Sequence, residues 1–409
     1  MPTAPAGLET TLSVTSHVLP LDGLRGVAVL LILAMHCFVR IPCPAEWPVL
    51  GFLQQALSLC YCGVDLFFVL SGFLIGGVLL DHRDAPNLYS VFYRRRSFRL
   101  LPLYFLLLAS FYAGRAVPAL RTLNFSTYFD SSVPLWSYWS FTQNIAMAWQ
   151  RDIGSYWLGP TWSLGVEEQF YLVIPVLVRL FDRRQLAWFC ALAIVISPGL
   201  RLLAWHGGNN QLAAIFLAPM RADSLLLGVL CAIGLRMTAP REWLQARRGW
   251  ILAATVALGC AVGLLSWQQQ TADSRDMVFW GYSVVGLFFT GCLLLVLLYP
   301  ASVAVHWLAW RPLVRLGLIS YFIYLAHLPV WYVCHWVLRG RPPSHLTGYG
   351  AAVTLLSLGL TLLLGLLSRR YFEGPLLDRG RGTKYLPAGD AAGASPSPAI
   401  PALGEPAAI

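Results

Sequence analysis

Long apolar runs separated by short polar segments dominate the pattern of this 409-residue chain. A helix needs about 20 mostly apolar residues to cross the hydrocarbon core of a bilayer. The runs that come near this length are 20–38, 59–80, 100–117, 160–180, 186–205, 211–235, 250–267, 278–300, 316–338 and 350–368. This pattern predicts an all-α integral membrane protein with about ten transmembrane helices.

The composition agrees with this interpretation. Hydrophobic residues make up 57% of the chain and charged residues 12%, whereas about 25% of a soluble domain is charged. The net charge of +10 comes from arginines that lie between the apolar runs, so it indicates membrane topology and no nucleic-acid partner. We expect a multi-pass protein surrounded by membrane lipid. The Arg-rich, Ala-rich usage is compatible with a bacterium, which makes the inner (plasma) membrane the expected location.

The distribution of Lys and Arg predicts the orientation of the chain. Cytoplasmic loops are enriched in these residues. With the N-terminus inside, the cytoplasmic loops hold more than twice as many as the outer loops, where we place Arg201. Both termini are therefore expected to be cytoplasmic. We divide the chain into an N-terminal cytoplasmic segment (1–19), a membrane domain (20–380) and a disordered Ala/Pro/Gly-rich tail (387–409).

The first apolar run contains two unusual residues, Arg25 and His36. An ionisable residue within a membrane span is by default a functional-site hypothesis. At about 100° per residue, the eleven steps between them bring His36 back to within about 20° of Arg25 and about 16 Å further along the axis. One helix face would then present a cation near the cytoplasmic side and a proton acceptor deeper in the membrane.

Five short segments form a recognisable set in this chain. They are LDGLRG at 21–26 with His36, GVDLFFVLSGFLI at 63–75, RSFRLLPLY at 96–104, TWSLGVEEQFY at 161–171 and ISYFIYLAH at 319–327. With these segments the chain resembles membrane acyltransferase family 3, in family order, from about residue 20 to 380. Members of that family O-acylate carbohydrates and related hydroxylated acceptors.

The resemblance implies an acyltransferase that uses acyl-CoA, most simply acetyl-CoA, as co-substrate and holds no bound cofactor or metal. Arg25, Arg96 and Arg99 would lie in one cytoplasmic layer and bind the donor's phosphates through charge-assisted contacts. His36 would be the general base for the acceptor hydroxyl. An acyl-histidine intermediate on the same residue is the alternative, and the sequence leaves both open.

Three carboxylates are candidate catalytic residues beside His36. Asp65, Glu167 and Glu168 are expected in the outer half of the membrane, where one of them could orient the imidazole. Adjacent residues of a helix point about 100° apart, so at most one of the two glutamates faces His36. Tyr171 shares a helix face with Glu167 and is a candidate for substrate binding. A buried network that ties helices together is the alternative for the carboxylates.

Further candidates for acceptor binding are Asn144, Trp162 and His327. Asn144 lies in an expected outer segment rich in Trp and Tyr, whose aromatic faces and amides could hold a sugar ring. An interfacial aromatic belt is the alternative. His327 falls in the middle of the ninth run, as Arg221 and Asp223 do in the sixth. Each is costly there unless it is paired or faces a cavity.

Two functions of different class follow from these residues. The first is an integral membrane O-acyltransferase that moves an acyl group from cytoplasmic acyl-CoA to a carbohydrate or glycosylated acceptor. The alternative is a transporter of a lipid-linked sugar or anion that uses the same buried charges, which would not consume acyl-CoA. Some relatives in the resembled family carry an esterase-like domain after the membrane part. We expect none here, so the membrane domain would complete the transfer or pass the group to another protein.

Overall fold

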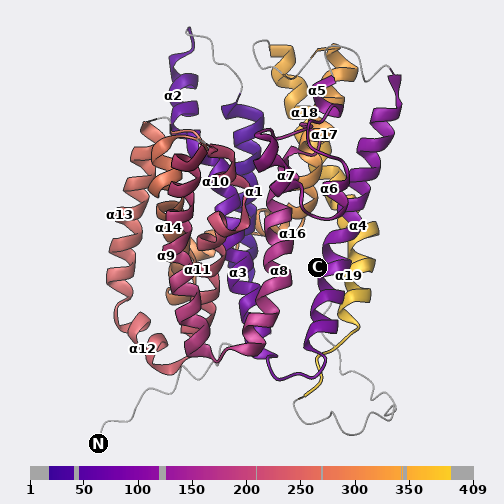
Figure 1. Ribbon diagram of the computed structural model, residues 1–409. Helices are drawn as coiled ribbons and strands as arrows, with labels where there is room; N and C mark the ends of the chain where they lie inside the picture. Colours follow the sequence, from indigo (N-terminus) through magenta and orange to yellow (C-terminus); the bar gives the residue numbers. More distant parts are fainter. Residues whose placement is uncertain are drawn as a thin grey trace, which may run out of the picture.

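The computed structural model describes residues 18–40, 46–118, 126–208, 210–268, 270–341, 343 and 348–387. Within these ranges all regular secondary structure is helical, as the apolar runs predict. The long helices run side by side along one direction and form a single bundle (Figure 1). The predicted N-terminal segment and C-terminal tail lie outside the described residues, apart from their innermost ends.

Ten long helices build the bundle. They are α1 (Leu19–Ala34), α3 (Gly63–Asp81), α4 (Leu88–Ala116), α8 (Trp162–Leu180), α9 (Arg183–Gly208), α11 (Ala218–Leu235), α13 (Arg248–Trp267), α14 (Tyr282–Leu298), α17 (Ser320–Arg339) and α18 (Gly348–Ser368). Shorter helices connect them or extend their ends. These are α2 (Pro48–Ala56), α5 (Ser126–Phe129), α6 (Trp136–Trp139), α7 (Gln143–Gln150), α10 (Gln211–Phe216), α12 (Thr238–Ala246), α15 (Val303–Leu308), α16 (Arg311–Leu318) and α19 (Gly374–Arg381).

In the described chain, five short segments of π-helix or 3₁₀ helix adjoin these α-helices. The π-helical turns are η1 (Met35–Val39), η5 (Met277–Gly281) and η6 (Arg369–Glu373), and the 3₁₀ turns are η2 (Ser58–Cys62) and η4 (Gly159–Thr161). The turn η1 continues α1 and contains His36. Turns of the π type inside helices are frequent at functional sites.

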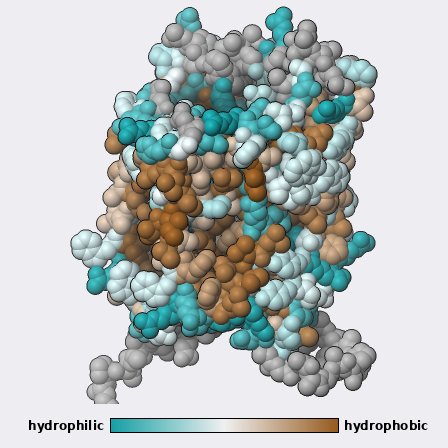
Figure 2. All heavy atoms as spheres, viewed as in Figure 1, coloured by the Kyte–Doolittle hydropathy of each residue, from teal (hydrophilic) through white to brown (hydrophobic). Residues whose placement is uncertain are grey.

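Nine stretches of the described chain are long and apolar enough to cross a membrane. They contain all the long helices except α8, which carries Glu167, Glu168 and Arg179. Hydrophobic side chains form a broad band around the middle of the face in Figure 2, and hydrophilic side chains gather above and below it. The chain is therefore an all-α integral membrane protein.

The structure differs from the predicted bounds at three places. Helix α4 begins at Leu88, well before the predicted apolar run, because a helix can continue past the hydrocarbon as long as no residue breaks it. The predicted span 211–235 is interrupted at Leu217, whose ψ is 131°, and α11 restarts with Pro219 in its first turn. Arg201 is buried inside α9 and does not lie in an outer loop.

Helices α3 and α11 share the most extensive helix–helix contact in the described chain, and α1, α8, α9 and α14 pack around them. A Cβ atom on Gly72 of α3 would lie 1.9 Å from the carbonyl oxygen of Leu225, and one on Gly228 of α11 would lie 2.1 Å from that of Val69. Small residues allow helix backbones to touch in this way. This contact places the first half of α3 directly against the start of α11.

We expect Gly228→Ala to lower the stability of the protein. Its methyl group would meet the backbone of α3, which cannot move aside as a side chain can, and overpacking of this kind costs about 1–3 kcal/mol. Thermal unfolding of the protein in nanodiscs measures the change. Gly263→Ala on α13 is the control, because nothing lies within 4 Å of its added atom. Equal melting temperatures for the two variants would contradict the close contact.

Candidate functional site

Two neighbouring pockets in the described part of the bundle share lining residues, because Val64 and Tyr324 line both of them. The first, which we call the arginine pocket, also contains Arg25, Arg96 and Arg99. The second, which we call the histidine pocket, is larger and contains His36. It extends to residues in α2, in the segment 151–156 and in the segment 270–273. The shared side chains of Val64 and Tyr324 lie where the two pockets meet, and we call them the wall.

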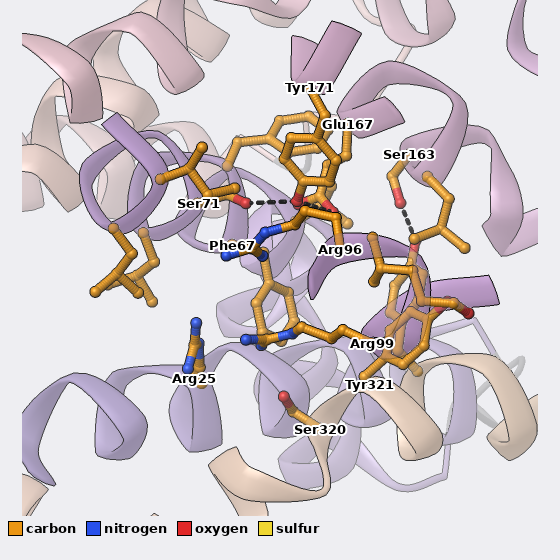
Figure 3. Close-up of a pocket in the computed structure, with 18 residues that line it drawn as sticks. Arg25, Phe67, Ser71, Arg96, Arg99, Ser163, Glu167, Tyr171, Ser320 and Tyr321 are labelled. Carbon is orange, nitrogen blue, oxygen red and sulfur yellow. Dashed lines mark hydrogen bonds between the residues drawn. The ribbon is translucent and has the colours of Figure 1, made fainter. Parts of the chain in front are cut away.

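The arginine pocket gathers three cations from two helices. Figure 3 shows the guanidinium groups of Arg25, from α1, and of Arg96 and Arg99, from α4, around the ring of Phe67. Arg25 is paired with Asp22 through an Nη1–Oδ1 contact of 2.9 Å, whereas no hydrogen bond or ion pair joins Arg96 or Arg99 to another described residue. Their N–H groups are therefore available to an anionic ligand.

A chain of hydroxyl groups holds Glu167 in the arginine pocket. The Oγ of Ser71 lies 2.9 Å from the Tyr171 hydroxyl, which donates to Glu167 Oε2 at 3.1 Å (Figure 3). All three residues line this pocket, whereas Glu168 lines neither pocket. Glu167 therefore faces the arginines and not His36, because its position on α8 points it toward α3 and α4.

His36 and His327 form a hydrogen-bonded pair. His327 Nδ1 lies 2.9 Å from the carbonyl oxygens of both Ile323 and Tyr324. His36 Nδ1 lies 3.0 Å from the Ile32 carbonyl oxygen and 3.3 Å from His327 Nε2. Carbonyl oxygens only accept, so Nδ1 carries the proton in both rings. His327 Nε2 then accepts from His36, and the Nε2 of His36 keeps its lone pair.

This geometry corrects the prediction that Asp65 or Glu167 orients His36. The ring is held by a backbone carbonyl and a second histidine, and no carboxylate bonds to it within the described chain. Asp65 instead accepts from Arg221 Nη2 at 2.6 Å and from Ser224 Oγ at 3.0 Å, both on α11. The close approach of α3 and α11 brings these groups together.

The wall between the pockets is held rigidly at Tyr324. Its hydroxyl donates to the Pro160 carbonyl oxygen at 2.7 Å and lies 2.7 Å from Ser163 Oγ. Its ring packs edge-on against Phe67, with 6.4 Å between the ring centres. The wall therefore joins α17 to α3 and to the start of α8.

The remaining sequence candidates divide between the pockets and the packing. Trp162 lines the histidine pocket. Asn144 lines neither pocket and is fully buried. Its amide donates to the Phe216 carbonyl at 3.0 Å, and its Oδ1 accepts from Gln169 at 2.9 Å. The amide of Asn144 thus joins α7 to α8 and α10, and its predicted contact with a sugar stays a prediction.

Arg201 is a buried charge, although the sequence predicts it in an outer loop. It pairs with Asp223 through an Nη1–Oδ2 contact of 2.9 Å, and neither side chain is more than 1% exposed. The sequence contains one indication of this pair, because Asp223 falls within an apolar run and needs a buried partner.

No group of three His, Cys, Asp or Glu side chains in the described chain could hold a metal ion.

Comparison with known proteins identifies the family. A family model described as an acyltransferase domain matches residues 19–364, which is most of the chain. The chain belongs to acyltransferase family 3. The five segments that carry the resemblance all lie within this match, and they contribute lining residues to both pockets. No solved structure matches the chain.

Curated relatives of this acyltransferase-family chain come from bacteria. An O-acetyltransferase OatA of Staphylococcus aureus is 26% identical over 382 residues, which cover 90% of this chain and 58% of the relative. A peptidoglycan O-acetyltransferase OatA of Listeria monocytogenes is 26% identical over 400 residues, covering 91% and 58%. A putative peptidoglycan O-acetyltransferase YrhL of Bacillus subtilis is 29% identical over 376 residues, covering 88% and 55%. The chain thus spans somewhat more than half the length of these relatives.

We expect Asp223→Asn to destabilise the protein by about 3–5 kcal/mol, because it leaves the guanidinium of Arg201 buried without a counter-ion. Unfolding in nanodiscs, followed by tryptophan fluorescence, measures this loss. The double variant Arg201→Met/Asp223→Leu removes both charges and should recover much of it. A single variant that is as stable as the wild type, or a double variant that is worse than the single one, would contradict the buried pair.

Proposed function

We propose that the protein is a membrane O-acyltransferase that moves an acyl group, most simply acetyl, from acyl-CoA to a hydroxyl of a carbohydrate or glycosylated acceptor. One observation carries this proposal. A pocket with unpaired guanidinium groups and a pocket with an unpaired imidazole nitrogen share the wall formed by Val64 and Tyr324. A donor in the first pocket and an acceptor in the second would meet at that wall.

The donor site is proposed from charge. Arg96 and Arg99 present planar N–H groups that suit the phosphates of CoA, and Arg25 adds a third cation. The excess of Lys and Arg on this side supports a cytoplasmic placement for it, with both termini inside and the chain in the inner (plasma) membrane of a bacterium. The pantetheine arm would run past Phe67 toward Tyr324.

The chemistry is proposed for the free nitrogen of His36. Its Nε2 removes the proton of the acceptor hydroxyl as the oxygen attacks the thioester carbonyl. The new C–O bond forms, the C–S bond breaks, and CoA leaves as a thiolate that takes up the proton. The Nδ1–H bonds to Ile32 and His327 strengthen while the ring is charged. Attack of the same Nε2 on the thioester, giving an acyl-histidine, is the two-step variant.

The acceptor is proposed from the relatives. Two of those described above are named as peptidoglycan O-acetyltransferases, so a glycan of the cell envelope is the acceptor class that we infer for this chain. A hydroxyl of such a glycan would enter the histidine pocket, where Trp162 and Tyr324 flank the path to His36. The acyl group most consistent with these names is acetyl.

We expect His36→Gln to reduce the rate of acyl transfer by about 10²–10⁴ while the affinity for acetyl-CoA stays the same. Glutamine can still donate to the Ile32 carbonyl but provides no base. The assay is CoA release by the protein in nanodiscs with cell-envelope glycans, and the mass of the glycan product. His306→Gln is the matched control, because His306 makes the same backbone contact four residues back, at 3.0 Å, on an exposed helix. A His36→Gln rate within tenfold of wild type would refute the base.

We expect Arg99→Gln to raise the acetyl-CoA KM by about tenfold to a hundredfold, which is the loss of one hydrogen bond to a charged group. Arg94→Gln on the same helix is the control, because that side chain is exposed and lies over Phe98 outside the pocket. The KM values are measured at saturating acceptor. Equal effects of the two variants on this KM would show that the arginines only set the orientation of the chain in the membrane and do not bind the donor. A protein that consumes no acetyl-CoA with any glycan would favour the transporter.

A further inference from the structure

The Asp65–Arg221 pair lines the histidine pocket and has hydrogen-bonding groups that no described residue uses. Both residues are only 1% exposed and line that pocket. The bond between them uses Arg221 Nη2 and Asp65 Oδ1. Asp65 Oδ2, Arg221 Nε, Arg221 Nη1 and the hydroxyl of Tyr61 are buried without a hydrogen-bond partner among the described residues. Buried polar groups are normally satisfied, so these four atoms need an explanation.

The neighbouring Arg201–Asp223 pair shows what a purely structural pair looks like in this bundle. Arg201 donates to the carbonyl oxygens of Val278 and Met220, to Asp223 and to Ser283 Oγ. Ser283 Oγ in turn donates to Asp223 Oδ2. Every nitrogen of this guanidinium has a partner within the protein. Helix α11 thus contributes one residue to each pair. We call Arg201–Asp223 the closed pair, because every guanidinium nitrogen has a partner, and Asp65–Arg221 the open pair, because two guanidinium nitrogens have none. Only the open pair lines the histidine pocket.

Aromatic rings hold the open guanidinium in place. The Cζ of Arg221 lies 3.8 Å from the ring centre of Tyr282 and 5.9 Å from that of Trp162. Tyr282, Trp162 and Tyr61 all line the histidine pocket. The aromatic rings therefore hold the guanidinium group of Arg221 at its flat faces, and its unused N–H groups lie along its edge. Flat rings beside donors and acceptors form a suitable surface for a sugar.

We propose that Asp65, Arg221 and Tyr61 form a subsite for the hydroxyl groups of a neutral sugar ring of the acceptor, with Trp162 and Tyr282 beside it. This inference rests on the proposed function. A hydroxyl both donates and accepts, so adjacent hydroxyls satisfy a carboxylate oxygen and a guanidinium N–H together. A phosphate fits less well, because Asp65 neutralises Arg221 and its free oxygen repels an anion. The arginine pocket would thus recognise the negative charge of the donor, whereas the histidine pocket would recognise the uncharged hydroxyl groups of the acceptor.

The test uses Tyr61→Phe, because removing Asp65 or Arg221 would leave a buried charge alone and could unfold the protein. The Tyr61 hydroxyl has no partner among the described residues, so its loss should not lower the melting temperature. Ser283→Ala, in the closed pair, is the control. An N-acetylglucosamine trisaccharide is the probe. Its affinity for the full chain in nanodiscs is measured without acetyl-CoA, by tryptophan fluorescence, and its KM is measured with acetyl-CoA.

We expect Tyr61→Phe to weaken trisaccharide affinity and raise its KM by about threefold to tenfold with no loss of melting temperature. Ser283→Ala should lower the melting temperature and leave the affinity unchanged. The proposal is overturned if the wild type does not bind the trisaccharide, if Tyr61→Phe binds it as well as wild type, or if Ser283→Ala weakens binding equally. Tyr61-dependent binding without acetyl transfer would support the subsite and count against the proposed enzyme activity.

Discussion

A polar group between these helices must find its partner inside the protein, because hydrocarbon offers none. The contact of α3 with α11 meets this demand at the centre of the bundle. Gly72 and Gly228 let the two backbones touch, and Asp65 can then reach Arg221 and Ser224. Backbone carbonyl oxygens are the hydrogen-bond partners of His327 Nδ1 and of the Tyr324 hydroxyl. Arg96, Arg99 and Arg221, which keep unpaired N–H groups, all line one of the two pockets.

The two pockets differ in the ligand that each can hold. The arginine pocket contains three guanidinium groups and one carboxylate, that of Glu167, and this excess of positive charge suits a polyanion. The histidine pocket contains His36 and the neutralised Asp65–Arg221 pair, which suits an uncharged, hydroxyl-rich molecule. Since one wall separates them, a reaction between two such ligands needs no further element. This division of charge is the basis of the arrangement of donor and acceptor that we propose for this member of the family.

Much of the architecture could be predicted from the sequence, because span length and apolar content are local properties. The shared layer of Arg25, Arg96 and Arg99 was also within reach, since each lies near one end of its apolar run. The partners of Asp65 and Arg201 were not. They depend on the rotation of one helix against another far along the chain, as in the pairing of Asp65 with Arg221. Residue spacing within a helix carries no information on that rotation.

The wall at Val64 and Tyr324 has a consequence for how such a protein would work. A carrier must expose its site alternately to the two sides of the membrane, and its helices must rock to do so. If the donor and the acceptor occupy separate pockets as proposed, only the few atoms of an acyl group would have to pass the wall. The nucleotide and the glycan would each remain on their own side. Turnover would then require small side-chain movements, and the bilayer would stay sealed against ions throughout.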